Sequence, residues 1–284
     1  MAAMSTALKA AVVPLHENLT AAQDLPDSSP LLADPVRLRE RYMADGCLLL
    51  RGLLPSEPLL AARTAILKLA RAAGWLDPTS TDDEAKAASG PPPDHMTEYM
   101  PVYRRIVRLP EFERTAEIPA LVAVTTLLFQ APVHIHRRRI GRVIFPRAER
   151  DTTQPHQDWH YIRGTPETIT AWIPTGDVPR SLGGLAVVPA SHRLGKLEHI
   201  PTTGAGGAGI PPQRVAGTWS GVDYRLGDVL LMHSLCIHGG LPNQSTDRLR
   251  ISFDHRFQPL GSDIDPGSLK RHDYGAGAIE DDTP

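Results

Sequence analysis

Apolar residues recur at helical spacing in the first third of the chain. From Pro35 the pattern predicts a helix that ends at Gly46, because glycine is favoured just after the last helical turn. A longer helix with one apolar face is predicted from Ser56, a favourable N-cap, as far as Gly74. A shorter helical segment follows near residues 117–129. The N-terminal third is therefore predicted to be mainly helical.

The rest of the chain has the pattern of short strands. From about residue 130, apolar or alternating runs are separated by Gly, Pro, Asp and Asn. These runs are PVHIHRRRIGRVIFP, ITAWIPTGD, GLAVVPASH, YRLGDVLLMHSLCIHGG and RLRISFDHRF, and CLLLRGLL is an earlier buried strand. We expect a mainly β fold with flanking helices, a sandwich or barrel. One domain over residues 36–284 would follow a loosely ordered lead-in over residues 1–35.

Two segments have the composition of long loops. Residues 77–94 are rich in Asp, Ser and Pro, and residues 201–217 are rich in Gly and Pro. Segments of this kind at the rim of a barrel can close over a bound substrate, so both are candidate lids.

Composition and net charge indicate which kinds of molecule the protein binds. The chain has 23 Gly and 27 Pro among 284 residues, an excess that favours a loop-rich β fold. Its net charge of -2 gives no general attraction to nucleic acid or anionic membranes. The apolar runs are also too short to span a bilayer. We expect a small-molecule partner, no nucleic acid and no membrane, and the sequence indicates no particular oligomeric state.

The two cysteines favour a reducing compartment. Cys47 and Cys236 each lie in an apolar run, as buried thiols do, and two cysteines cannot form a disulfide framework. Lys9 is the only early basic residue of the N-terminal segment, and Pro14 interrupts its short apolar stretch. Because this pattern does not match a secretory signal, we expect a cytoplasmic protein.

The densest group of chemically active residues is QPHQDWHY, at 154–161. If this run is a strand, His156 and Asp158 lie on the same face, because side chains two residues apart share a face. His238, in LLMHSLCIHGG, is the best candidate for a third ligand. Two imidazoles and one carboxylate leave three metal positions open, as in non-haem iron(II) oxygenases. The alternative is that these are a surface histidine and a satisfied core histidine, without a metal.

Two arginines on one predicted strand indicate an anion inside the fold. Arg248 and Arg250 alternate with Leu249 and Ile251, and a guanidinium on an otherwise apolar strand is costly unless it is paired. A carboxylate held by two parallel hydrogen bonds would be a suitable partner. The alternative is an edge strand with both arginines in solvent. The basic stretch over 134–142 would imply an anionic substrate if it faced inward, but we favour a solvated strand edge.

Taken together, these motifs resemble the phytanoyl-CoA dioxygenase family of iron(II)/2-oxoglutarate oxygenases. HQDWHY, TAWIPTGDVPRSLGGLAVVPASHRLG and GDVLLMHSLCIHGGLPNQSTDRLRIS carry the resemblance in the family's order. RYMADGCLLLRGLLPSE resembles the family's N-terminal opening, so the resemblance covers about residues 36–258. It implies a double-stranded β-helix, a jelly-roll variety of the cupin fold, which agrees with the β pattern.

The resemblance also implies roles for particular residues. His156, Asp158 and His238 would bind iron(II). Arg248 would hold the far carboxylate of 2-oxoglutarate. We prefer it to Arg250 because RLRIS then aligns with the family's Arg-x-x-Ile/Leu-Ser strand.

Three further positions match residues near the family's co-substrate. Gln157 and Trp172 correspond to positions that line the 2-oxoglutarate pocket, and Gly240 lies where the family often has a small residue. The family's Pro-Gly-Ser-His turn has Ala190 in place of glycine here, which is a mild departure. Asp158 retains the carboxylate that halogenating relatives lose, so the resemblance implies a hydroxylase or a related oxidase.

We therefore predict an oxidoreductase, an iron(II)- and 2-oxoglutarate-dependent dioxygenase. It would hydroxylate a C–H bond of a small-molecule metabolite, consume dioxygen and release succinate and carbon dioxide. An acyl-CoA substrate is not implied, because the sequence has no CoA-specific feature. Two alternatives stay open, a cupin-like metal protein that does not use 2-oxoglutarate and a catalytically silent binding protein. Zinc-dependent hydrolysis is disfavoured because it leaves the inward arginine unexplained.

Overall fold

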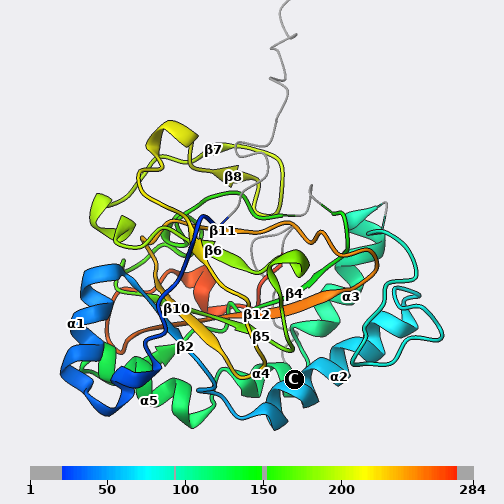
Figure 1. The fold of residues 1–284 in the computed structure, drawn as a ribbon, viewed down its shortest axis with the longest axis horizontal. Coiled ribbons are helices and arrows are strands. Elements are labelled where there is room, and N and C mark those ends of the chain that lie inside the picture. The colour runs from blue at the N-terminus through cyan, green and yellow to red at the C-terminus, as the bar shows by residue number, and fades with distance from the viewer. Residues whose placement is uncertain (1–20, 93, 149–151, 274–284) are drawn as a thin grey trace, which may run out of the picture.

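Helices from the N-terminal third pack against one face of a β-sheet (Figure 1). The protein is described by a computed structural model over residues 21–92, 94–148 and 152–273. Its α-helices are α1 (Pro35–Asp45), α2 (Ser56–Ala72), α3 (Met100–Ile106), α4 (Pro110–Thr115), α5 (Pro119–Phe129) and α6 (Trp159–Ile162). A π-type turn, η2 (His95–Tyr99), precedes α3. Short 3-10 helices are η1 (Ser29–Ala33), η4 (Arg180–Leu182), η5 (Ser191–Leu194), η6 (Pro212–Arg214) and η7 (Pro266–Leu269).

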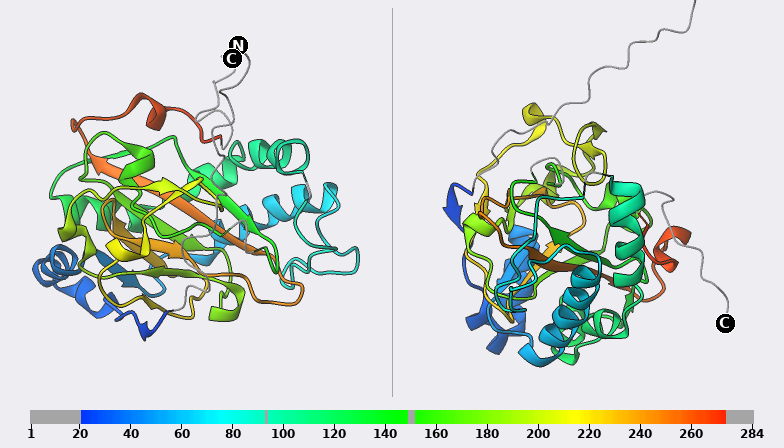
Figure 2. Two further views of the ribbon diagram at one scale, coloured as in Figure 1. Left: turned by 90° about the horizontal axis from the view of Figure 1, so that it is seen from above. Right: turned by 90° about the vertical axis from the view of Figure 1, so that its right-hand side faces the viewer.

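Two facing sheets form the β part of the molecule. The larger has the order β2 (Cys47–Leu50), β10 (Val229–His233), β5 (Ile169–Pro174), β12 (Arg250–Pro259) and β3 (Val133–Ile135), with β4 (Ile140–Ile144) also paired to β12. The smaller has the order β1 (Gln23–Asp24), β9 (Ser220–Gly221), β6 (Leu185–Val187) and β11 (His238–Gly240). A separate hairpin joins β7 (Ile200–Pro201) to β8 (Ala208–Gly209). Figure 2 shows β12, in orange, running through the length of the molecule.

The central strands read as unbroken apolar runs because both of their faces are buried. In β2, Leu48 and Leu50 pack into the core shared with the helices, whereas Leu49 packs between the two sheets. In β5, Ile173 faces the helices and Trp172 the space between the sheets. Successive side chains of these strands therefore point into two different apolar cores, so neither face of the strand is polar. The predicted mainly β, jelly-roll fold is confirmed, as two facing sheets and not a closed barrel.

Most of the predicted elements occur where the pattern placed them. The first helix ends at Gly46, whose φ of +67° is the left-handed conformation that glycine adopts readily. The lead-in differs from its prediction over residues 21–35, where β1 pairs in parallel with β9 and Leu25 is buried. Residues 1–20, including the N-terminal segment considered as a signal, lie outside the described residues. Residues 201–217 are not one long loop, because part of the β7–β8 hairpin falls within them.

Within residues 21–92, 94–148 and 152–273, no helix combines the length and apolar character needed to cross a membrane.

Candidate active site

Three side chains from distant parts of the chain meet in one place. The Nε2 atoms of His156 and His238 lie 3.6 and 3.9 Å from Oδ1 of Asp158. Candidate ligand atoms of all three residues lie within 4.8 Å of one another, and the side chains are buried. With metal–ligand bonds of about 2 Å, this spacing fits three ligands on one face of a single metal ion. We call these residues the triad.

Backbone hydrogen bonds hold the two histidines opposite each other. His156 N donates to His238 O at 2.9 Å, and His238 N donates to His156 O at 3.1 Å, as in a hydrogen-bonded antiparallel pair. Residues 154–161 do not form a strand, however. Asp158 has helical dihedral angles (φ -59°, ψ -31°) and leads directly into α6. The turn into α6, and not strand alternation, brings Asp158 beside His156.

Each imidazole presents its Nε2 atom to the site. Nδ1 of His156 bonds to Gln154 O at 2.8 Å, and Nδ1 of His238 bonds to Cys236 O at 2.9 Å. Because a carbonyl only accepts hydrogen bonds, both Nδ1 atoms donate and both Nε2 atoms are left to bind a metal. Burial, together with the neighbouring His156, lowers the pKa of His238 to about 4. This ring is therefore neutral at pH 7, the form that binds metal ions.

Asp158 is held by a hydrogen bond at each carboxylate oxygen. Oγ1 of Thr170 donates to Oδ2 at 2.5 Å, and Nη2 of Arg256 donates to Oδ1 at 3.2 Å. Burial alone would raise the pKa of this carboxyl, but Arg256 and the two histidines outweigh it and hold the pKa well below its usual value. The carboxylate is therefore ionised and fixed in orientation, as a metal ligand requires.

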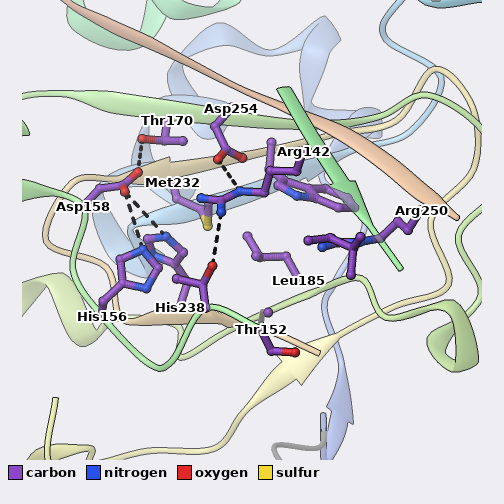
Figure 3. Close-up of a pocket in the computed structure, with 14 residues that line it drawn as sticks. Arg142, Thr152, His156, Asp158, Thr170, Leu185, Met232, His238, Arg250 and Asp254 are labelled. Carbon is purple, nitrogen blue, oxygen red and sulfur yellow. Dashed lines mark hydrogen bonds and ion pairs between the residues drawn. The ribbon is translucent and has the colours of Figure 1, made fainter. Parts of the chain in front are cut away.

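A narrow cavity extends from the triad into the space between the two sheets. This inner cavity has a volume of about 20 Å³. Its lining residues are Arg142, Ile144, Thr152, Thr153, His156, Asp158, Thr170, Trp172, Leu185, Met232, His238, Gly240, Arg250 and Asp254. Figure 3 shows the triad at one end of the cavity, Arg250 at the other, and Arg142 between them.

Arg250 is a buried cation with unused hydrogen-bond donors. Its side chain is 4% exposed, and its Nε and Nη1 atoms have no hydrogen-bond partner within the described residues. Its guanidinium carbon lies 5.9 Å from the centre of the Trp172 ring. Burial, followed by the charge of Arg142, lowers the pKa of Arg250 to about 10, so the group is still charged at pH 7. A charged group in this state indicates a site for an anion.

Arg248, the arginine that the sequence analysis preferred, lies outside the inner cavity. It precedes β12, forms a bridge with Lys86, and lines a neighbouring cavity of about 300 Å³ together with Arg63. Of the two arginines, only Arg250 lines the cavity that contains the triad. The structure therefore places Arg248 in a different cavity from the triad, and which of the two arginines holds the co-substrate stays a proposal.

The three remaining predicted site residues divide into two groups. Trp172 and Gly240 line the inner cavity. Gln157 does not, because its side chain is used in the fold. Its Nε2 donates to Gly195 O and Leu235 O, and its Oε1 accepts from Leu197 N. Gln157 therefore fixes the loops beside the triad and is not available to a bound molecule.

Strand β12 supplies polar residues that the sequence analysis missed. Its inward row is Arg250, Ser252, Asp254, Arg256 and Gln258. Asp254 lines the inner cavity and accepts from Nε of Arg142 at 2.9 Å, while Arg256 bonds to Asp158. The sequence contained a signal for these residues: in RISFDHRFQ, every second residue after Arg250 lies on the same face of the strand as Arg250.

A second cavity shares His156 and Asp158 with the inner cavity. This outer cavity has a volume of about 140 Å³. Its lining residues are Arg138, Ile140, Arg142, Thr153, His156, Asp158, Tyr161, Ala205, Gly206, Arg256, His272 and Asp273. The expectation that the basic stretch over 134–142 is solvated is therefore wrong for Arg138 and Arg142. The β7–β8 hairpin, which contains Ala205 and Gly206, forms part of the cavity wall.

Comparison with known protein families shows which family has this sequence. The family model described as Phytanoyl-CoA dioxygenase matches residues 42–252. The chain belongs to the phytanoyl-CoA dioxygenase family. Membership confirms the predicted oxidoreductase, an iron(II)- and 2-oxoglutarate-dependent oxygenase, and the His-Asp-His triad fits the iron that such an enzyme uses.

Two curated members of similar length resemble the chain. The 1-deoxypentalenic acid 11-beta-hydroxylase of Streptomyces arenae is 31% identical over 259 residues, which cover 84% of this chain and 86% of that protein. The enzyme of the same name from Streptomyces exfoliatus is 30% identical over 258 residues, with the same coverage.

Solved structures share the fold at lower identity. The epimerase SnoN in complex with Fe3+, alpha ketoglutarate and nogalamycin RO has a TM-score of 0.60 and 22% identity, covering 83% of this chain and 87% of its own. EctD from S. alaskensis with 2-oxoglutarate and 5-hydroxyectoine has a TM-score of 0.54 and 16% identity, covering 91% and 89%. At these identities the likeness supports the fold alone.

Proposed function

We propose that this oxygenase hydroxylates a C–H bond of a small organic molecule, with iron(II) on the triad and 2-oxoglutarate in the inner cavity. The observation that carries the proposal is the inner cavity itself. Three metal-ligand side chains and a buried guanidinium with unused donors face the same space. A 2-oxoglutarate oxygenase needs both, because its co-substrate chelates the metal at one end and carries a carboxylate at the other.

The triad and Arg250 have different roles in this proposal. His156, Asp158 and His238 hold the iron, and Arg250 binds the far carboxylate of 2-oxoglutarate. Iron bound there supplies dioxygen activation coupled to the loss of carbon dioxide from the co-substrate. The chain's own contribution is position, since the backbone bridge fixes the two histidines while Thr170 and Arg256 fix Asp158.

Hydroxylation is favoured among the outcomes open to such enzymes. The two curated relatives at 31% and 30% identity are both hydroxylases. Asp158 also keeps in place the carboxylate ligand that a halogenating site needs to lose. The outer cavity is lined by His156 and Asp158 but not by Arg250, and this is the space proposed for the substrate.

We also propose that the enzyme works in the cytoplasm, without a nucleic-acid or membrane partner. Cys47 and Cys236 are buried free thiols, as expected in a reducing compartment. The net charge of -2 provides no general attraction to polyanions.

The proposal is tested by paired arginine variants. Metal-free protein is mixed with iron(II) and 2-oxoglutarate without air, and the visible charge-transfer band of the chelate is titrated. Succinate is then measured under air. We expect Arg250→Gln to raise the half-saturating 2-oxoglutarate concentration by about ten-fold or more, because a charge-assisted interaction is lost. Arg248→Gln is the matched control and should leave it unchanged.

Asp158→Ala should abolish both the band and succinate formation. A wild-type protein that binds iron(II) but gives no band would contradict the proposal in favour of an enzyme independent of 2-oxoglutarate. Absence of iron binding as well would favour the silent binding protein. An effect of Arg248→Gln equal to that of Arg250→Gln would overturn the assignment of Arg250.

A further inference from the structure

The outer cavity contains more positive charge than its own carboxylates neutralise. Three guanidinium groups line it, from Arg138, Arg142 and Arg256. Arg142 pairs with Asp254 (Nε–Oδ2, 2.9 Å), and Arg256 pairs with Asp158 (Nη2–Oδ1, 3.2 Å). These pairs account for two of the three cations. Asp273 also lines the cavity, but its carboxylate pairs with Arg104 at 2.9 Å.

Arg138 is the third cation, and its hydrogen-bond partner is a neutral backbone carbonyl. Its Nη1 donates to the backbone carbonyl of Tyr161 at 2.9 Å. Within the described part of the chain, no carboxylate oxygen lies within 4.0 Å of its guanidinium nitrogens. The carboxylates of Asp158 and Asp265 attract it from beyond this distance, but Asp158 already accepts from Arg256 and Asp265 from Gly267 N. Burial, and after it the like charge of Arg256, lowers the pKa of Arg138, although the charges of Asp158 and Asp265 oppose this shift.

Two partly or fully buried guanidinium groups that repel each other are costly unless an anion joins them. The rest of the outer cavity is suited to a carbon skeleton, because Ile140, Ala205 and Gly206 line it as well. A molecule in this cavity would therefore place an anionic group at Arg138 and its hydrocarbon part beside the triad.

We infer that the substrate is a small organic anion, whose oxyanion group binds Arg138 in the outer cavity. This inference rests on the proposed function and names its substrate class. A carboxylate and a phosphate ester share the necessary chemistry, since both accept parallel hydrogen bonds from a guanidinium. Arg138 is then a specificity-determining residue, distinct from Arg250, which binds the co-substrate at the other end of the site.

The test measures binding and does not depend on turnover. Cyclohexanecarboxylate, its methyl ester and cyclohexyl phosphate are titrated by calorimetry into metal-free protein saturated with 2-oxoglutarate. We expect at least one anion to bind about ten-fold or more tightly than the ester, because the ester lacks the charge-assisted hydrogen bonds. The tighter of the two anions identifies the oxyanion that the site prefers.

Arg138→Gln should reduce the affinity for the anion to that for the ester, and Arg138→Lys should restore part of the preference. Arg137→Gln, at an exposed neighbouring position, is the matched control and should keep the full preference. All three variants should retain the wild-type affinity for 2-oxoglutarate, which also shows that they fold.

Two outcomes would overturn the inference. One is equal affinity of the wild-type protein for both anions and the ester. The other is a preference that disappears in Arg250→Gln but survives in Arg138→Gln, since the probe would then occupy the inner cavity. The charge-transfer titration with iron(II) is run separately, so its failure would contradict the proposed function without affecting these binding results.

Discussion

The Thr170 hydroxyl orients a metal ligand without touching the metal position itself. It donates a 2.5 Å hydrogen bond to Oδ2 of Asp158. Thr170→Val keeps the shape of the side chain and removes this donor, so the carboxylate loses one of its two restraints. We expect the affinity for iron(II) to fall by about 10- to 100-fold, as is usual when such a partner of a ligand is removed. Competition with a chromophoric chelator measures the change.

Thr175→Val is the control for this experiment. Thr175 is also buried, and its hydroxyl donates to Ile251 O at 3.1 Å, away from the triad. Both variants should lower the free energy of unfolding by about 1 kcal/mol, the cost of one hydrogen bond. Equal iron affinities in the two variants would contradict the role assigned to Thr170.

The choice between Arg248 and Arg250 shows where residue-level reasoning from the sequence stopped. Both positions share a face if the strand extends over them, so alternation cannot separate them. The separation comes from a turn, in which Nδ2 of Asn243 and Oγ of Ser245 donate to Arg248 O. These contacts occupy the Arg248 carbonyl, and β12 begins only at Arg250. The triad was predictable because its motifs occur together in the family's order, whereas the bond from Arg256 to Asp158 joins residues 98 positions apart in the sequence.

At the scale of elements, the β7–β8 hairpin depends on one tyrosine. Oη of Tyr161, on α6, donates to Ala208 O at 2.8 Å and so ties the hairpin to the wall of the outer cavity. Tyr161→Phe removes this tie, and the hairpin should open more often. We expect hydrogen exchange over residues 200–210 to accelerate about five-fold, the effect of losing about 1 kcal/mol. Mass spectrometry of the exchanged peptides measures it.

Tyr224→Phe is a matched control, because Oη of Tyr224 donates to the backbone carbonyl of Leu185 at 2.9 Å, in the core between the sheets. It should leave exchange in the hairpin unchanged. If both variants accelerate exchange over 200–210 equally, the tie through Tyr161 is not what holds the hairpin.

Helices and strands whose ends are marked by nearby residues were predicted more accurately than those that depend on residues far away in the sequence. The helix before Gly46 has its own stop signal and occurs as predicted. Residues 154–161 alternate like a strand, yet Asp158 O accepts from both Tyr161 N and Ile162 N and so begins a helix. The pairing of β1 with β9 joins Gln23 to Ser220, and no local pattern indicates a partner that far along the chain.

At the scale of the whole molecule, buried neutral histidines make stability depend on pH. Burial lowers the pKa of His136 to about 3, and it lowers the pKa values of His255 and His272 well below their usual value. In the unfolded chain each imidazole has a pKa of about 6.5. Below pH 6.5 the unfolded state therefore binds more protons than the folded state, and stability falls as the pH falls.

The size of this effect follows from linkage. From pH 7.5 to 5.5 each of the three histidines should lower the free energy of unfolding by about 1 kcal/mol, and His238, whose pKa is about 4, should add a similar amount in the metal-free protein. Urea denaturation of metal-free protein at several pH values measures the slope. His136→Gln removes one of the proton-binding groups and should make this fall smaller by about 1 kcal/mol, even if it destabilises the protein at every pH. A wild-type free energy of unfolding that is flat between pH 7.5 and 5.5 would show that these imidazoles reach solvent and are protonated in the folded state.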